Sequence, residues 1–464
     1  MAAIKPHILI LAAGMGTRMK SKVSKVLHPV LYRPMLHHLL DAASALPHAS
    51  INVVVGENSS AVKEACSGYK TINYIHQPSP QGTGHAVLCA RETLQEKGGT
   101  VLVLNGDVIL MRPETLSAFI QSHEQKHAVG SLVSAKFKQP FGYGRILRDG
   151  SGRPLAIREE KDCSETEKQV NEVNVGVYLF DTDSLFSALE RVQTSNKQKE
   201  YYLTDVVEIL ISGSESVNAF LMPDPTEALG INDRFALAEA EEILAERVRG
   251  HWMREGVSLH HPRSITIDPR SRFGSDVEVE ANCRILNTVV ESGVYIEAGC
   301  RIENSTIRAG AHLKEGCYIE SAEVGPESTL GPYLHLRPGT RLEAGVKLGN
   351  FVEVKNSHVG KGSKASHLSY IGDAEVGADV NIGCGFITCN YDGQKKHKTV
   401  IEDGVFVGSD SQAVAPLTIG KGAYVASGTT LTRDVPPGAL AIAREKQVNK
   451  EGFVARLRPQ KKKD

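Results

Sequence analysis

The sequence has no excess of charge of either sign and no paired-cysteine motif. Its 53 Lys and Arg residues balance 54 Asp and Glu residues, which gives a formal net charge of −1. Without an overall basic field, the chain is not predicted to bind nucleic acid or a membrane surface. Its eight cysteines show neither CxxC nor CxxxC spacing, so zinc sites and disulfide frameworks are both disfavoured.

Long apolar runs are also missing. The run from Ile8 to Ala13 is too short for a secretory signal, and a glycine-rich loop follows it in place of a cleavage site. No stretch approaches the roughly 20 apolar residues that span a bilayer. We therefore expect a cytoplasmic protein without a membrane span, in which Lys461, Lys462 and Lys463 form a solvated tail.

The second half of the chain repeats every six residues. A branched aliphatic residue recurs at about this interval from Ile285 to Leu431, and glycine often follows it, as in Val324-Gly325. The period fits neither a helix nor an alternating strand, and it is typical of a hexapeptide β-helix. Cys283, Cys300 and Cys317 lie 17 residues apart, close to three hexapeptides, so we expect them to stack on successive coils in the core.

The first half alternates strand-like and helix-like segments, which predicts an α/β domain with a largely parallel sheet. The strand candidates are His7–Ala12, Ile51–Val55, Val101–Leu104, Val129–Val133 and Gly176–Phe180. Asn232 or Asp233 can cap a helix, rich in Ala, Glu, Leu and Arg, that runs to about Glu255. We predict an α/β domain at 1–228, a linker helix at 229–256, and a β-helix domain with a C-terminal tail at 257–464.

Two glycine-rich loops and one acidic strand end are candidate binding segments. Segment 11–19, LAAGMGTRM, follows an apolar strand, and its backbone N–H groups with Arg18 and Lys25 can bind phosphate oxygens. It has neither the GxGxxG nor the GxxxxGK[ST] spacing. Gly82 lies in a loop where the backbone can approach a base or a sugar. Asp107 follows a strand, where a carboxylate is a good Mg²⁺ ligand. Each residue alone also fits an ordinary turn or a solvated helix face.

Together these segments resemble the sugar-nucleotide pyrophosphorylases. The resemblance extends to GYGR (142–145), EEKD (159–162), NVG (174–176), EYYLTD (200–205) and Asn232, in the family's order and spacing. With the β-helix attached, nearly the whole chain resembles the bacterial bifunctional enzymes that make UDP-N-acetylglucosamine, a precursor of peptidoglycan and lipopolysaccharide. The resemblance implies a Rossmann-like nucleotidyltransferase domain joined by a helix to a left-handed parallel β-helix.

The resemblance implies uridylyl transfer in the first domain. N-acetylglucosamine 1-phosphate would attack the α-phosphorus of UTP and pyrophosphate would leave, so the protein must position two anions and neutralise charge. Asp107 and Asn232 would hold Mg²⁺. The residues implied to bind UTP and the UDP-sugar are Leu11, Gly14, Arg18, Lys25, Gln77, Gly82, Thr83, Gly144, Glu159, Asn174 and Asn232.

The β-helix would carry the second reaction. His367 lies in a small, polar stretch, and a polar insertion from Thr388 to Thr399 interrupts the repeat. By the resemblance, His367 is the general base that deprotonates the amine of glucosamine 1-phosphate, which then attacks the thioester of acetyl-CoA. Residues implied to bind this sugar phosphate are Arg337, Lys355, Tyr370, Asn381, Asn390, Tyr391 and Lys396. Those implied to bind acetyl-CoA are Cys384, Ser409, Ser427 and Arg444.

Some positions depart from the family's usual pattern. Ser24 stands where proline is usual, Asn105 where tyrosine is common, and Ser366 where glycine is common. Asn105 is two residues from the implied metal ligand Asp107, so its departure bears on the sugar contacts. The family's β-helices associate as trimers with active sites between subunits, so the resemblance also implies a homotrimer.

Two other functions stay open on the sequence alone. One is a monofunctional sugar-nucleotide pyrophosphorylase whose β-helix serves oligomerisation or regulation, and His367 with the 388–399 insertion speaks against it. The other is a non-catalytic scaffold that binds nucleotide sugars, and Arg18, Lys25 and Asp107 speak against it.

Overall fold

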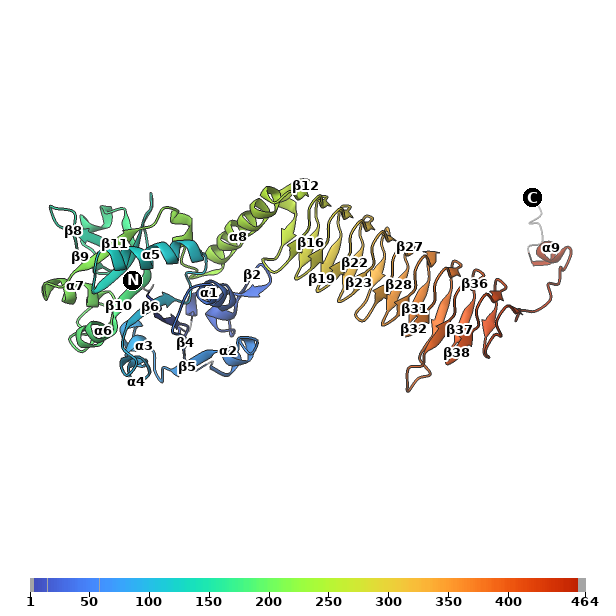
Figure 1. The fold of residues 1–464 in the computed structure, drawn as a ribbon, viewed down its shortest axis with the longest axis horizontal. Coiled ribbons are helices and arrows are strands. Elements are labelled where there is room, and N and C mark those ends of the chain that lie inside the picture. The colour runs from blue at the N-terminus through green and yellow to red at the C-terminus, as the bar shows by residue number, and fades with distance from the viewer. Residues whose placement is uncertain (1–3, 15, 58, 458–464) are drawn as a thin grey trace, which may run out of the picture. The chain divides into compact units, whose positions relative to one another are not determined.

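The structure is a computed structural model that describes residues 4–14, 16–57 and 59–457. Met15 of the first glycine-rich loop and the lysines 461–463 therefore lie outside the described residues. The chain forms two compact units, Met1–Leu244 and Ala245–Asp464, each with its own core (Figure 1). Over the residues described, no helix combines the length and apolar character needed to cross a bilayer.

The first unit is built on a nine-stranded sheet. The strands along its main path are β11 (Val217–Leu221), β7 (Gly130–Lys136), β10 (Glu172–Asp181), β6 (Thr100–Asn105), β1 (His7–Leu11), β4 (Ser50–Val55) and β5 (Ile72–His76), in that order. β10 is antiparallel to both of its neighbours, and the other pairs on this path are parallel. β8 (Arg145–Arg148) and β9 (Pro154–Arg158) extend from β10. The sheet is therefore mixed: β1, β4, β5 and β6 form the predicted parallel part, whereas the antiparallel pairing of β10 with β6, β7 and β8 departs from the largely parallel sheet that was predicted.

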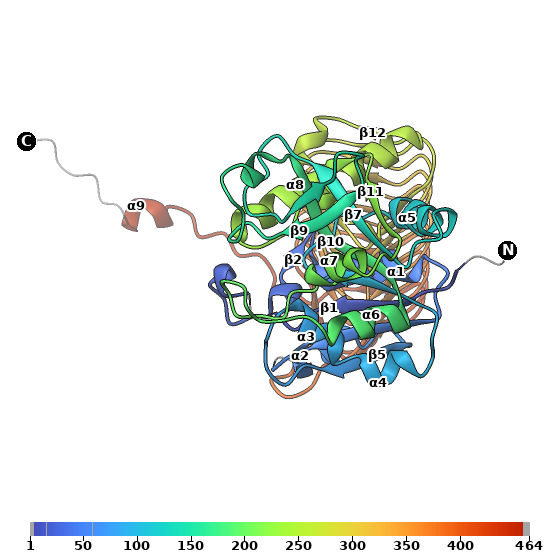
Figure 2. The ribbon, with the colours of Figure 1, turned by 90° about the vertical axis from the view of Figure 1, so that its left-hand side faces the viewer.

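Helices cover both faces of this sheet (Figure 2). Leu9 of β1 is buried in one core, and its neighbours Ile8 and Ile10 are buried in the other. The first core is shared with α3 (Thr83–Leu88), α4 (Arg91–Gln95), α6 (Thr182–Leu189) and α7 (Asp205–Ser212). The second is shared with α1 (Met35–Ser44), α2 (Ser59–Ala65) and α5 (Pro113–Gln125). A parallel strand buried on both faces explains the continuous apolar run of β1.

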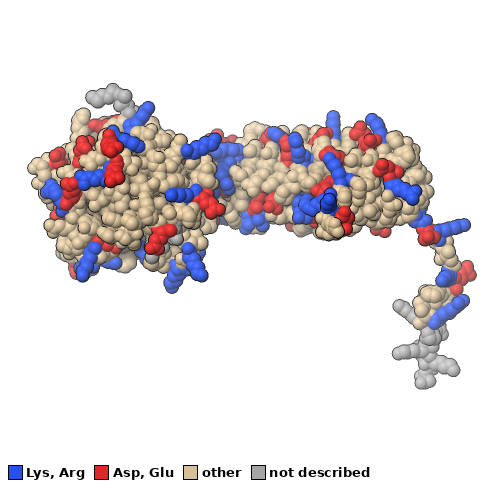
Figure 3. All heavy atoms as spheres, turned by 90° about the horizontal axis from the view of Figure 1, so that it is seen from below, with Lys and Arg blue, Asp and Glu red and all other residues tan. Residues whose placement is uncertain are grey.

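The helix α8 (Arg234–Arg254) contains the division between the two units, which falls between Leu244 and Ala245. After it, the second unit is a left-handed parallel β-helix of three sheets with eleven, ten and nine strands, from β12 (Ser258–Leu259) to β41 (Leu440–Ala441) (Figure 1). Lysines and arginines are interspersed with acidic residues on the face seen in Figure 3, as the balanced composition predicts.

The six-residue period places one aliphatic side chain of each strand inside the coil. Ile285 of β16 (Arg284–Leu286) pairs with Ile302 of β19 (Arg301–Glu303), which pairs with Ile319 of β22 (Tyr318–Glu320), and all three are 0% exposed. Cys283, Cys300 and Cys317 are buried and their thiols contact one another, so their predicted stacking is confirmed.

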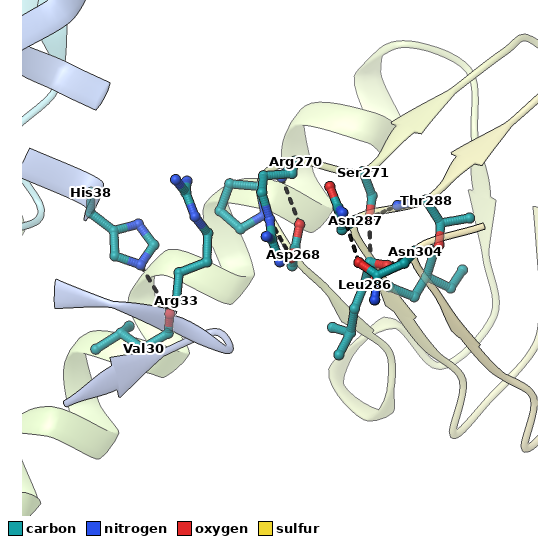
Figure 4. A network of polar contacts seen from close by, with 12 residues as sticks. Val30, Arg33, His38, Asp268, Arg270, Ser271, Leu286, Asn287, Thr288 and Asn304 are labelled. Atoms are coloured by element: carbon teal, nitrogen blue, oxygen red, sulfur yellow. Dashed lines mark hydrogen bonds and ion pairs between the residues drawn. The ribbon is translucent and has the colours of Figure 1, made fainter. Parts of the chain in front are cut away.

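Polar residues stack in the same way at one turn of the coil. Asn287 and Asn304 have positive φ angles of 47° and 48°, and the Nδ2 of Asn287 donates to the Oδ1 of Asn304 at 2.7 Å (Figure 4). Asparagine and aspartate adopt this left-handed conformation more readily than other residues with side chains. Asn356 and Asp373 adopt it at the equivalent turn of later coils, where the second candidate site lies.

Candidate active sites

The strand order of the first unit creates a crevice at the carboxyl ends of β1 and β6. From β1 the chain proceeds to β4 and β5 on one side and returns to β6 on the other, so the loops after β1 and β6 diverge. Leu11 lies opposite Asn105, and the Gly106 N–H donates to the Leu11 carbonyl oxygen at 3.0 Å. A Cβ on Gly106 would lie 2.5 Å from that oxygen, so the close approach requires glycine.

Three charged groups and one amide meet in this crevice. The Lys25 Nζ donates to Asp107 Oδ2 at 2.7 Å and to Asn232 Oδ1 at 2.8 Å. A guanidinium N–H of Arg18 donates to the same Asn232 oxygen at 2.8 Å. Asp107 Oδ2 and Asn232 Oδ1 both accept from the Lys25 ammonium group, so the position between these two oxygens favours a cation. An aspartate and an amide oxygen are also the ligand types that Mg²⁺ accepts together with phosphate and water, so the residues fit the implied metal.

A cavity of about 280 Å³ opens beside this charged cluster. Seven of the residues implied for the first reaction line it, namely Leu11, Gly14, Lys25, Gln77, Gly82, Thr83 and Asp107. Asn105 and Glu200 also line it. Ser24 is buried and borders a smaller hollow with Gly14 and Gln77.

The second glycine-rich loop is held by the EYYLTD segment. The Gly84 N–H donates to the Tyr201 carbonyl oxygen at 2.8 Å, and the Tyr201 N–H donates to the Gln81 carbonyl oxygen at 2.9 Å. Gly82 has a φ of +105°, and a Cβ there would lie 2.5 Å from the Tyr201 oxygen. The Leu203 N–H donates to the Thr83 hydroxyl at 3.1 Å. Two motifs that are far apart in the sequence thus form one wall of the cavity.

The residues implied for the sugar lie along β10 and the strands beside it. The Asn174 N–H donates to the Gly144 carbonyl oxygen at 2.8 Å, and the Thr204 hydroxyl donates to Glu159 Oε1 at 3.3 Å. Burial raises the pKa of the Glu159 carboxyl, and the Thr204 hydrogen bond partly offsets this effect. Thr204 was missed by the prediction, although it lies within the EYYLTD motif.

Asn105 connects β10 to the cavity. Its amide packs against Gly176, whose φ is +80°, and a Cβ on that glycine would lie 2.1 Å from the Asn105 Nδ2. The departure at Asn105 therefore lies in the cavity lining, together with Asp107.

On the β-helix, His367 is paired with a residue of the preceding coil. Asn350 of β27 (Lys347–Asn350) lies opposite His367 of β30 (Lys364–His367), and the Asn350 Oδ1 is 2.8 Å from the His367 Nδ1. An amide oxygen can only accept, so Nδ1 carries the proton and Nε2 of the exposed ring is the free basic nitrogen. Asn350 was missed, and its spacing of 17 residues from His367 is the signal that could have identified it.

The residues implied for acetyl-CoA continue this column of turns. The Gly385 N–H donates to the Leu368 carbonyl oxygen at 3.0 Å, which places Cys384 one coil beyond His367. The Asp410 N–H donates to the Cys384 carbonyl oxygen at 2.7 Å, and the Gly428 N–H donates to that of Ser409 at 2.9 Å. A guanidinium N–H of Arg444 reaches the Ser427 carbonyl oxygen at 2.8 Å. These four residues therefore stack on consecutive coils.

A cluster of cations lies at the adjacent turn. Lys355, in β28 (Glu353–Lys355), pairs with Gly372 of β31 (Tyr370–Gly372), and a Cβ on Gly372 would lie 2.4 Å from the Tyr370 hydroxyl. The Lys355 ammonium lowers the pKa of the neighbouring Lys396. Two adjacent ammonium groups form a site for an anion. Arg337 forms an ion pair with Glu353 at 2.9 Å.

The insertion that carries Lys396 lies between β34 (Ile387–Cys389) and β35 (Thr399–Ile401). Tyr391 pairs with Lys396 across this hairpin. The Asn390 Nδ2 donates to Asp373 Oδ2 at 2.5 Å, and the Thr399 N–H donates to the Asp373 carbonyl oxygen at 3.2 Å. Asp373 thus holds both ends of the insertion, and the prediction missed it.

Asn381 is the implied sugar residue that the structure does not join to this cluster. It lies on β33 (Asn381–Ile382), opposite Lys364. Within the part of the chain that is described, its side chain forms no hydrogen bond with Lys355, Tyr370 or Lys396.

Comparison with known proteins identifies the family of this chain. Residues 7–243 match the nucleotidyl transferase family. The bifunctional protein GlmU of Geobacillus sp. (strain WCH70) is 46% identical over 454 residues, 98% of each chain. That of Shouchella clausii (strain KSM-K16) is 43% identical over 453 residues, 96% of this chain and 98% of the relative. That of Geotalea uraniireducens (strain Rf4) is 45% identical over 446 residues, again 96% and 98%. The chain belongs to the family of bifunctional GlmU proteins, and its first 243 residues contain the nucleotidyl transferase domain.

Proposed function

We propose that this protein has two active sites. One is the crevice of the first unit, and the other is formed on the β-helix by the column of turns that begins at His367 and by the adjacent turn with Lys355 and Lys396. As a GlmU protein it is a bifunctional enzyme that makes UDP-N-acetylglucosamine by acetyl transfer and uridylyl transfer. We assign uridylyl transfer to residues 1–228, acetyl transfer to 257–464, and the connection to 229–256. The observation that carries this assignment is that seven of the implied residues of the first unit line one cavity beside Lys25 and Asp107, while Lys355 and Lys396 lie next to each other on the β-helix.

Acetyl transfer comes first in this scheme. Lys355 and Lys396 bind the phosphate of glucosamine 1-phosphate, because their mutual repulsion is relieved by an anion. The His367 Nε2 removes a proton from the sugar amine while Asn350 holds the ring through Nδ1. The amine nitrogen then attacks the thioester carbonyl carbon, and CoA leaves as the thiolate. Successive coils are about 4.8 Å apart, so acetyl-CoA can extend from His367 along Cys384, Ser409 and Ser427.

Uridylyl transfer follows in the crevice. Gly144, Glu159 and Asn174 hold N-acetylglucosamine 1-phosphate, and Arg18 and Lys25 neutralise the triphosphate. A phosphate oxygen of the sugar displaces pyrophosphate from the α-phosphorus. Bound through Asp107 and Asn232, Mg²⁺ would supply further neutralisation of the phosphate charge.

We propose a homotrimer in the cytoplasm. An exposed apolar strip, Tyr333, Phe351 and Leu368, lies beside the His367 column, and the rings of Tyr333 and Phe351 stack at 6.0 Å. Contiguous exposed apolar residues of this kind mark protein interfaces. All eight cysteines are free thiols, which fits a reducing compartment.

One incubation tests the assignment. The protein is mixed with glucosamine 1-phosphate, acetyl-CoA, UTP and Mg²⁺, and the products are read by mass spectrometry. We expect UDP-N-acetylglucosamine, CoA and pyrophosphate. His367→Ala should abolish CoA release and leave uridylylation of added N-acetylglucosamine 1-phosphate intact. Asp107→Ala should abolish uridylylation and leave CoA release intact. CoA release by the His367 variant at the wild-type rate would refute the assignment of the base.

A further inference from the structure

The cavity of the first unit has a cationic end and an end without cations, where Glu200 lies beside Gly82. Asp107 follows β6, whereas Gln77 follows β5, and β1 and β4 lie between those two strands. Neighbouring strands are about 4.8 Å apart, so roughly 14 Å separates the two positions along the sheet edge. Cations lie at the Asp107 end, while Gln77 is accompanied by Pro80, Gly82 and Ala86 in the cavity lining. The cationic end fits phosphates, and the end without cations fits a base.

The Gln77 amide at the end without cations is held in one orientation. The residue is 5% exposed, and its backbone N–H donates to the Val55 carbonyl oxygen at 2.8 Å. Its side-chain Nε2 lies 3.4 Å from the Gly82 carbonyl oxygen and 3.0 Å from the His85 Nδ1. A carbonyl oxygen can only accept, so the amide NH₂ must face Gly82, and the His85 Nδ1 must accept the second N–H.

His85 does not line the cavity itself. It lies on α3, where its ring is 6.4 Å from the ring of Tyr201, on the segment that holds the second glycine-rich loop. With both amide protons of Gln77 committed to Gly82 and His85, the Gln77 Oε1 is left as an acceptor for a ligand. An acceptor at this position matches the ring N–H of uracil, whereas the corresponding nitrogen of cytosine has a lone pair in place of a proton.

We propose that His85 is a positioning residue that fixes the Gln77 amide so that its carbonyl oxygen reads the ring N–H of uracil, and that it thereby selects UTP over CTP. The inference rests on the proposed function, in which the cavity binds UTP. Without an acceptor at position 85 one amide N–H loses its partner and only the Gly82 oxygen, at 3.4 Å, still holds the NH₂ group. The orientation that matches UTP is then held less firmly against the reversed one, which presents the NH₂ group and matches CTP. Specificity for the base thus depends on a side chain behind the one that contacts it.

Steady-state uridylylation with UTP and with CTP tests the proposal. His85→Phe keeps a ring beside Tyr201 but removes the acceptor, and His85→Asn restores an acceptor through its Oδ1. One net hydrogen bond corresponds to about 0.5–1.5 kcal/mol, so His85→Phe should raise the KM for UTP about two- to thirteen-fold. Its ratio of kcat/KM for UTP over CTP should fall by at least as much. The KM for N-acetylglucosamine 1-phosphate should stay unchanged.

His85→Asn should regain most of the preference for UTP, which a purely structural role of the ring would not allow. His76→Leu serves as the control, because His76 is an exposed histidine adjacent to Gln77. Thermal unfolding checks that each variant folds, and His85→Leu provides a second variant without an acceptor.

An unchanged UTP to CTP ratio in the folded variants without an acceptor would overturn the proposal. So would a His85→Asn enzyme that behaves like His85→Phe. If the wild-type enzyme formed no UDP-sugar from UTP, the proposed function of the cavity would fail instead, and the two failures are therefore distinguishable.

Discussion

Replacement of Asp373 by asparagine should weaken acetyl transfer without affecting uridylyl transfer. Asp373 accepts hydrogen bonds from Asn356 Nδ2 at 2.6 Å and from Asn390 Nδ2 at 2.5 Å. Asparagine has the same size and tolerates the left-handed backbone, where φ is 49°. It has only one side-chain oxygen, however, so one of the two bonds must be lost and two NH₂ groups must face each other.

Two effects of opposite sign follow from this change. A hydrogen bond to a charged group contributes about 1.5–3 kcal/mol, so docking of the Asn390 end of the insertion should weaken by about ten- to one hundred-fold. Loss of the negative charge also leaves Lys355 and Lys396 with a stronger field for phosphate, but exposed charges contribute only about 0–1 kcal/mol. The first effect is the larger one, so we expect the KM for glucosamine 1-phosphate to rise about ten-fold or more.

The assay measures CoA thiol release against the concentration of glucosamine 1-phosphate. Asp379→Asn is the matched control, because Asp379 is an exposed aspartate with a φ of 55° at another turn of the β-helix. Uridylylation by both variants should equal that of the wild-type enzyme. A KM for the Asp373 variant at or below the wild-type value would refute the reasoning. It would show that removing the negative charge affects phosphate binding more than losing the hydrogen bond to the insertion.

Three further predictions concern stability and the first site. Val290→Ala removes two buried carbons at 1% exposure and should lower the free energy of unfolding by about 2 kcal/mol in urea titrations, whereas Val289→Ala, at 45% exposure, should change it by less than about 0.5 kcal/mol. Burial raises the pKa of Asp205 to about 6, so the native state holds this proton more tightly and stability falls as pH rises through the interval from about 4 to about 6. Asp205→Asn should therefore raise the melting temperature above pH 6 but not below pH 4, and an equal shift at both would contradict the pKa. Gly106→Ala, whose Cβ would lie 2.5 Å from the Leu11 oxygen, should lower uridylylation more than ten-fold in a pyrophosphate-release assay while CoA release is retained.

The architecture could be predicted because its signals are local and repeated. An inward aliphatic at every sixth residue, from Ile285 onward, leaves a short strand one way to bury its side chain, and each coil repeats that solution. The apolar run of β1 likewise requires cover on both faces. The identity of the candidate site residues came from the resemblance of the motifs, which retain family order and spacing.

The contacts within the sites were decided by the tertiary structure. Lys25 and Asn232 are separated by 207 residues. They meet because β1, which precedes Lys25, lies beside β6, and because the Ile231 N–H donates to the carbonyl oxygen of Asp107 after β6. Asn350 and Asp373 become partners of His367 and Asn390 only through the register of the coils.

The orientation of Gln77 similarly depends on His85, which has no motif of its own. Periodicity reports which side of a strand is buried, and it carries no information about which distant groups share a hydrogen bond. Strand order, coil register and the closure of the loops determine those contacts. All three are properties of the folded chain.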